Sequence, residues 1–211
     1  MITFKKFLTE VNKAKVKTTK PVVFAFGRMN PPTVGHEVLV NKVKDIAKEQ
    51  DAHHEIVLSH SQDPKKNPLS PEQKLTHARR MFPGTNLSVA TSKEPTLLHH
   101  LQRLHQAGHD EVTVVAGEDR VPEYTHLINH YNSTPTKDGK QLFAFKRVNV
   151  VSAGARDPDA EGVEGMSASK MRAAASAGQR ETFHSGLPKR LSTEHKDALY
   201  NDIRAGMGVK E

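Results

Sequence analysis

Two short motifs, far apart in the sequence, carry side chains that could hold phosphate groups. Residues 24–36 form an apolar strand that breaks into a turn and then opens a helix near His36. Residues 165–172 place hydroxyl groups and two cations on the first turn of another helix. The start of a helix offers unpaired backbone N–H groups and partial positive charge, and both favour an anion. The two motifs together predict a polyphosphate clamped between two helix starts, and hence an enzyme that handles nucleotides.

In the first motif, each residue type suits a phosphate site. Gly27 lets the backbone come close to a ligand because it has no Cβ. Thr33 offers a hydroxyl and Gly35 leaves room, while His36 can donate a hydrogen bond to a phosphoryl group under attack. The alternative interpretation is a turn followed by an N-capping threonine and a surface histidine.

The second motif follows an acidic, glycine-rich loop at residues 157–165 and precedes an alanine-rich helix. Ser167 and Ser169 supply hydroxyls at the helix start, and Lys170 and Arg172 add positive charge for terminal phosphates. The alternative is a helix cap whose cations are solvated.

Apolar strands alternate with helical patterns along the chain. Strands are predicted at residues 21–26, 55–59, 86–90, 111–116 and 142–151. Helices are predicted over roughly 35–50, 70–84, 95–108 and 122–131, and from about 167 and 193; a capping box at 70–73 marks one start. The alternation predicts an α/β fold: a single Rossmann-like domain with a five-stranded parallel sheet, helices on both faces, and additional C-terminal helices. Gly27 and Gly117 follow two of the strands, at the edge where such sheets bind ligands.

Composition favours a cytoplasmic protein. Charged residues make up 26% of the 211 residues, and no apolar run approaches the roughly 18 residues that a membrane span needs. The sequence has no cysteine, which excludes disulfides, thiolate metal sites and cysteine nucleophiles, and it has no recognisable secretory signal. We expect a basic N-terminal arm at residues 1–20, the main domain at 21–190 and a C-terminal helix or tail at 191–211.

The net charge of +7 raises the question of nucleic acid as a partner. With three Tyr, no Trp and no known nucleic-acid motif, we interpret the charge as serving an anionic substrate and solubility. Much of the excess is a run of lysines in residues 5–20. The adjacent histidine pairs at 53–54 and 99–100 lack partners at zinc spacing, so no protein-ligated metal is predicted.

Residues 27–36 resemble the (His/Thr)-x-Gly-His signature of a nucleotidyltransferase superfamily, and residues 166–172 resemble its second motif, Ile-Ser-Ser-Thr-x-x-Arg. Residues 59–72 are similar to the Asn-Pro-Phe-Thr segment of archaeal-type nicotinamide-mononucleotide adenylyltransferases. The resemblance covers roughly residues 21–180. Thr33 replaces the first histidine, as the superfamily accepts, whereas Ala168 replaces a hydroxyl and Lys170 stands where threonine is usual.

The resemblance implies attack by a phosphomonoester on the α-phosphorus of a nucleoside triphosphate, with release of pyrophosphate. It implies ATP as the donor, nicotinamide mononucleotide as the first acceptor to test, a place in NAD biosynthesis, and Mg²⁺ bridging the phosphates. One alternative is a cytidylyltransferase that uses CTP and a sugar- or polyol-phosphate. Another is a non-catalytic nucleotide- or nucleic-acid-associated module, motivated by the basic arm and by the substitutions at Ala168 and Lys170.

The resemblance also assigns site residues, in three groups. Catalytic roles fall on His36, Thr33 and Arg172. Nucleotide contacts fall on Gly27, Arg28, Met29, Gly35, Ser167, Ser169 and Lys170. Substrate contacts fall on Ser59, Asn67, Gly117 and Asp119. The alternatives are that Ser59 only ends a strand, that Asn67 belongs to a turn, and that Gly117 and Asp119 belong to an exposed charged turn.

Residues 7–10 resemble the short targeting and cleavage segments on internal head proteins of large tailed phages. This implies a phage-encoded enzyme, located in the host cytoplasm or the virion interior. The alternative is an amphipathic arm that packs on the domain. We expect no membrane partner, and the sequence is compatible with a homo-oligomer.

Overall fold

Five parallel strands form the centre of the part of the chain that the structure describes. This computed structural model describes residues 20–154 and 166–209. The basic arm up to residue 19, with its segment 7–10, and the acidic loop 157–165 therefore lie outside the described residues. The strands are β1 (Val22–Gly27), β2 (His53–Leu58), β3 (Leu87–Val89), β4 (Glu111–Ala116) and β5 (Arg147–Ser152).

The strand order is β3-β2-β1-β4-β5, and every neighbouring pair is parallel. The chain runs outward from β1 to β3, crosses back to β4 beside β1, and continues outward to β5. The order therefore reverses between β1 and β4, and in open α/β sheets the ligand crevice lies at this switch point. The predicted parallel α/β fold is confirmed.

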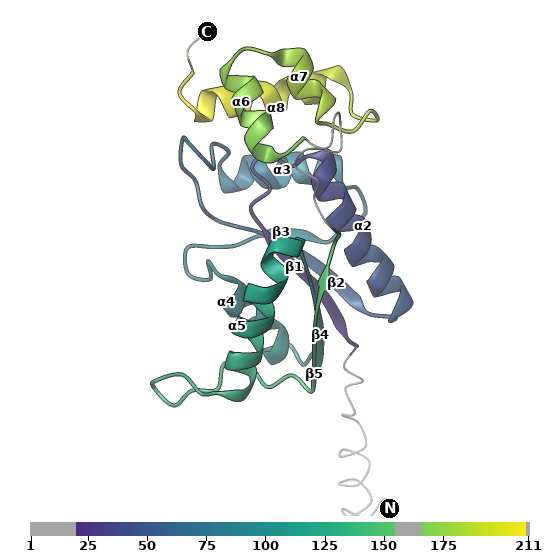
Figure 1. Cartoon of the computed structure of the whole chain (residues 1–211), viewed down its shortest axis with the longest axis vertical. Coiled ribbons are helices and arrows are strands. Elements are labelled where there is room, and N and C mark those ends of the chain that lie inside the picture. The colour runs from purple at the N-terminus through teal and green to yellow at the C-terminus, as the bar shows by residue number, and fades with distance from the viewer. Residues whose placement is uncertain (1–19, 155–165, 210–211) are drawn as a thin grey trace, which may run out of the picture.

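Helices cover both faces of the sheet (Figure 1). The helices α2 (Val34–Glu49) and α3 (Pro71–Met81) pack with one set of strand side chains, and α4 (Leu97–Gln106) and α5 (Val121–Ser133) pack with the other. In β1 the faces alternate by residue: Val23 and Ala25 belong to the first cluster, Val22 and Phe24 to the second. A strand buried on both faces explains why β1 is an uninterrupted apolar run.

Three C-terminal helices lie together beyond the carboxyl ends of the strands, next to α3 (Figure 1). They are α6 (Ala168–Ser176), α7 (Arg180–Ser185) and α8 (Thr193–Gly206). Buried side chains from all three, including Met171, Phe183 and Ile203, join the core cluster under α2 and α3. The sequence did not predict α7, because six residues are too few to show helical periodicity.

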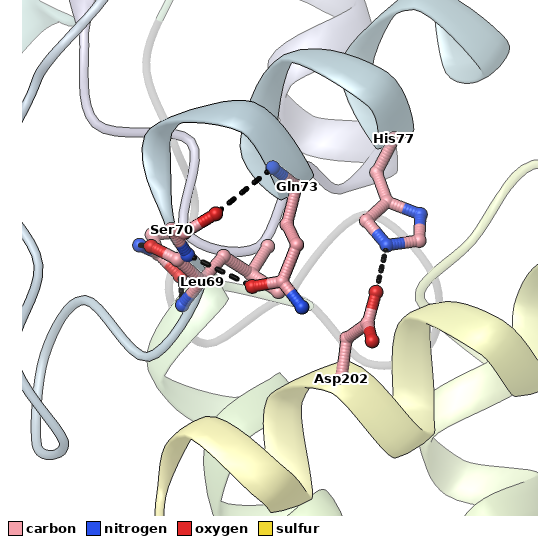
Figure 2. A network of polar contacts seen from close by, with 6 residues as sticks. Leu69, Ser70, Gln73, His77 and Asp202 are labelled. Atoms are coloured by element: carbon pink, nitrogen blue, oxygen red, sulfur yellow. Dashed lines mark hydrogen bonds and ion pairs between the residues drawn. The ribbon is translucent and has the colours of Figure 1, made fainter.

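The predicted capping box at the start of α3 is confirmed, and it lies beside the contact between α3 and α8 (Figure 2). The backbone N–H of Gln73 donates to Ser70 Oγ at 3.2 Å, and the Ser70 N–H donates to Gln73 Oε1 at 3.0 Å. Farther along α3, Nε2 of the buried His77 lies 2.7 Å from Oδ2 of Asp202 on α8. A Cβ at Gly206 would overlap the Pro68 carbonyl, so glycine lets α8 pack directly on the loop before α3.

The prediction of a strand from residue 142 was wrong at its start, because β5 begins at Arg147. Phe143 and Phe145 are buried as a strand pattern would have them, but they lie outside the sheet. The side-chain amide of Asn132 takes the place of a partner strand: Nδ2 donates to the Phe145 carbonyl at 3.0 Å, and the Phe145 N–H donates to Oδ1 at 2.7 Å. The remaining boundaries differ from prediction by a few residues, as β2 does in starting at His53.

The helices described here include none with the length and apolar character needed to cross a lipid bilayer.

Two buried histidines and one half-buried histidine lead us to expect that the folded protein loses stability in mild acid. Burial lowers the pKa of His54, His77 and His100 below the ordinary value of 6.5. Below about pH 6.5 the unfolded chain binds protons that the folded protein does not, so the free energy of unfolding falls with pH. Above that pH these groups are neutral in both states and contribute nothing.

We expect His100→Leu to lose less stability than the wild type between pH 7.5 and 5.5, measured by urea unfolding. The His100 ring is buried beside the rings of Phe24 and Phe26, so leucine removes the titrating group and keeps an apolar contact. His99→Leu, at the exposed neighbouring position, is the matched control and should keep the wild-type pH dependence. An unchanged loss in His100→Leu would contradict the assignment.

Candidate functional site

A cavity of about 940 Å³ opens at the carboxyl ends of β1 and β4, at the switch point of the sheet. Its walls come from the loop after β1, the first turns of α2 and α6, and the segment after β4. Both predicted motifs therefore face one space, although they are far apart in the sequence. A cavity of this size can hold a nucleotide together with part of a second substrate.

The loop after β1 is held in place by a side-chain amide. Asn30 Nδ2 donates to the Leu69 carbonyl at 3.3 Å, and the Leu69 N–H donates to Asn30 Oδ1 at 3.1 Å. Met29, just before it, adopts the left-handed backbone conformation with φ of 42°. At Gly27 a Cβ would meet no atom of the described residues within 4 Å, so packing among them does not demand glycine there. Open space over the backbone is what a closely approaching ligand requires.

His36 is the third residue of α2, and its ring is oriented by the helix cap. The Thr33 backbone N–H donates to His36 Nδ1 at 3.1 Å, and Thr33 Oγ1 lies 3.0 Å from the same nitrogen. Because a backbone N–H can only donate, Nδ1 accepts, and the neutral imidazole carries its proton on Nε2. His36 lines the cavity, whereas Thr33 is fully buried and is not part of the lining. The cap thus makes Nε2–H the hydrogen-bond donor of the ring.

Arg172 joins the two motifs. Its Nη1 donates to the Asn30 carbonyl in the first motif at 2.7 Å, and its Nη2 donates to Ser169 Oγ in the second at 3.1 Å. Ser167 caps α6 by accepting the Lys170 backbone N–H at 3.2 Å. The guanidinium group therefore sets the distance between the loop after β1 and the start of α6.

Positive charge concentrates in the corner of the cavity between the two motifs. Arg28 and Lys66 line it together with Arg172. Burial, and next the charge of Arg28, lower the pKa of Arg172, while Asp63 acts in the opposite direction. Two guanidinium groups close enough to repel each other favour a polyanion between them.

The opposite wall follows β4 and is more mixed in charge. Gly117 precedes the short 3₁₀-helix η1 (Glu118–Arg120), and a Cβ on it would lie 2.9 Å from Asp119 Oδ1, so the carboxylate folds back over the glycine. Arg120 donates to Glu123 Oε2 at 2.8 Å. Tyr124 adds an aromatic ring, and burial raises the pKa of its hydroxyl. This wall offers a carboxylate and a ring to a ligand.

Ser59 and Asn67 lie in the segment after β2. Both are buried, and neither is part of the lining. Asn67 Nδ2 donates to Asp63 Oδ2 at 2.5 Å, and the backbones of the two residues form an antiparallel bridge. The bridge shapes the loop so that Lys66 faces the cavity.

Most of the residues assigned from sequence come together here. The cavity is lined by Gly27, Arg28, Met29, Gly35, His36, Gly117, Asp119, Ser167, Ser169 and Arg172. Thr33, Ser59, Asn67 and Lys170 are not part of the lining. Sequence reasoning did not identify Asn30, Lys66 or Tyr124, although Lys66 lies within the segment 59–72 that carried the resemblance.

No family model matches the chain, and a search of curated proteins found no similar sequence. Among the residues that the structure describes, no group of three His, Asp or Glu side chains is arranged to hold a metal ion.

Proposed function

We propose that the chain is a nucleotidyltransferase that transfers AMP from ATP to a phosphomonoester, with nicotinamide mononucleotide as the first acceptor to test. The main support is the contact of Arg172 with Asn30 and Ser169, because it brings two helix starts and three cations around one cavity. Such a corner suits the triphosphate, and the remaining volume suits an acceptor.

In the proposed reaction, an oxygen of the acceptor phosphate attacks the α-phosphorus. The bond from that phosphorus to the oxygen bridging to the β-phosphate breaks, and pyrophosphate leaves. His36 donates its Nε2–H to a non-bridging oxygen of the α-phosphate as negative charge builds there. Because no covalent enzyme intermediate forms, the site needs no nucleophilic side chain.

The β- and γ-phosphates would occupy the positive corner. The guanidinium of Arg172, the hydroxyls of Ser167 and Ser169, and the cations Arg28 and Lys66 are the groups available to hold them. Mg²⁺ would be held by phosphate oxygens and water, which fits a cavity whose described residues offer no cluster of carboxylates and imidazoles. The ion would neutralise phosphate charge.

The wall after β4 favours nicotinamide mononucleotide over a phosphomonoester whose organic part carries no charge. Its pyridinium ring is cationic and aromatic, and Asp119 and Tyr124 offer a carboxylate and a ring to such a group. The enzyme would then serve NAD biosynthesis, in the cytoplasm of a cell or of a phage-infected host.

We expect labelled dinucleotide and an equal amount of pyrophosphate when the protein is incubated with α-labelled ATP, Mg²⁺ and nicotinamide mononucleotide. The same assay with the other three triphosphates and with sugar- and polyol-phosphates measures selectivity. Product from CTP with a polyol-phosphate, and none from ATP, would instead establish a cytidylyltransferase. Triphosphate binding without any product would favour the non-catalytic module.

A further inference from the structure

Lys74, on α3, is fully buried, and no other Lys, Arg, Asp or Glu among the described residues is. Burying an ammonium group is costly unless hydrogen bonds replace its water. The resemblance gave this lysine no role, and it is not part of the cavity lining. Its burial beside the end of β2 therefore calls for an explanation.

The ammonium group ties together the backbone at the end of β2. Nζ donates to the Ser59 carbonyl at 2.6 Å and to the Ser61 carbonyl at 3.2 Å, and lies 3.4 Å from Ser59 Oγ. The Ser59 N–H in turn donates to the Gly27 carbonyl at 2.8 Å. A single buried cation thus holds the segment that leads to Lys66 and, through Ser59, the start of the loop after β1.

The charged neighbours of Lys74 make its protonation sensitive to the cavity. Burial, and next the charge of Arg28, lower the pKa of Lys74 to about 8. The other nearby ionisable groups have partners of their own: Asp63 accepts from the loop that contains Asn67, and His77 contacts Asp202 of α8. Arg28, which lines the cavity, is therefore the charged link between ligand and lysine.

We propose that Lys74 is a positioning residue that holds the end of β2 against the loop after β1 and takes up a proton when a nucleoside triphosphate binds. The proposal rests on the triphosphate site of the proposed function. A polyanion beside Arg28 offsets the positive charge that repels the ammonium group and adds attraction of its own, so the protonated lysine is favoured in the complex.

This coupling predicts a specific dependence of affinity on pH. Below about pH 8 the lysine is already charged, and binding needs no proton. Above that pH a proton must be taken up, so affinity falls as pH rises. We expect affinity at pH 9 to be about fivefold lower than at pH 7.

Calorimetric titration of the full chain with α,β-methylene-ATP and Mg²⁺ at pH 8.5 measures this proton directly. The observed heat is compared in buffers that differ in ionisation enthalpy, and we expect uptake of about half a proton per nucleotide in the wild type. Lys74→Arg, which stays charged, should show none and should bind equally at pH 7 and 9. Where arginine prevents folding, Lys74→Gln keeps a donor without charge and should also show no uptake.

Lys44→Arg is the matched control. Lys44 Nζ also donates to a backbone carbonyl, that of Pro83 at 3.0 Å, but lies outside the cavity lining, so proton uptake should stay at the wild-type value. Saturable binding with no uptake in the wild type, or uptake that persists in Lys74→Arg or Lys74→Gln, overturns the coupling and leaves the triphosphate site standing. Absence of any binding overturns both.

Discussion

His36→Ala is expected to lower turnover by about 10²- to 10³-fold, while affinity for the triphosphate changes far less. The reason lies in the ring geometry: Nδ1 accepts the Thr33 N–H, so the neutral ring donates through Nε2–H, the group proposed to act on the α-phosphate. A donor that acts on charge developing during attack stabilises the transition state more than the bound substrate. Steady-state kinetics, combined with calorimetric titration of α,β-methylene-ATP, separates the two effects.

The chain contains its own control for this variant. His99 is the third residue of α4 and lies 2.7 Å, through Nδ1, from the hydroxyl of the capping Thr96, which repeats the hydroxyl contact between Thr33 and His36. It is exposed and outside the cavity lining. His99→Ala should therefore remove a similar side-chain contact at a helix start and leave turnover unchanged. Near-normal turnover in His36→Ala would refute the proposed role.

Arg172→Lys is expected to weaken triphosphate affinity about tenfold or more, because hydrogen bonds to charged groups contribute about 1.5–3 kcal/mol each. The guanidinium donates at once to the Asn30 carbonyl and to Ser169 Oγ, which the single ammonium of lysine cannot reproduce. Turnover should fall as well, since the spacing between the motifs is no longer held. Affinity for the acceptor alone should be nearly unchanged.

Arg204→Lys is the matched control for Arg172→Lys. Arg204 Nη1 also donates to a backbone carbonyl, that of Ala175 at 2.8 Å, but it lies on α8 outside the cavity lining. Calorimetric titration of both variants with α,β-methylene-ATP tests the difference. Equal affinities in Arg172→Lys and the wild type would mean that the second motif is only a helix cap.

The sequence by itself predicted the features that arise from neighbouring residues. The alternation of apolar strands and amphipathic helices, the capping box at Ser70 and the helix starts near His36 and Ser167 all depend on contacts within a few residues. Such contacts can be predicted from the spacing of residue types along the sequence. The order of elements then limited the fold to a parallel sheet, for which a ligand crevice is expected at the ends of β1 and β4.

Only the tertiary structure decided what the distant residues do to one another. Phe143 and Phe145 have a strand-like pattern, yet Asn132 satisfies the Phe145 backbone and keeps this segment out of the sheet. Likewise, the sequence around Lys74 is typical of a surface lysine on an amphipathic helix. In the fold, however, α3 packs this lysine against the end of β2. Burial and hydrogen-bond partners depend on which segments pack together, and local spacing does not encode that. For the same reason the sequence predicted two phosphate motifs, while their joining through Arg172 and Asn30 came from packing.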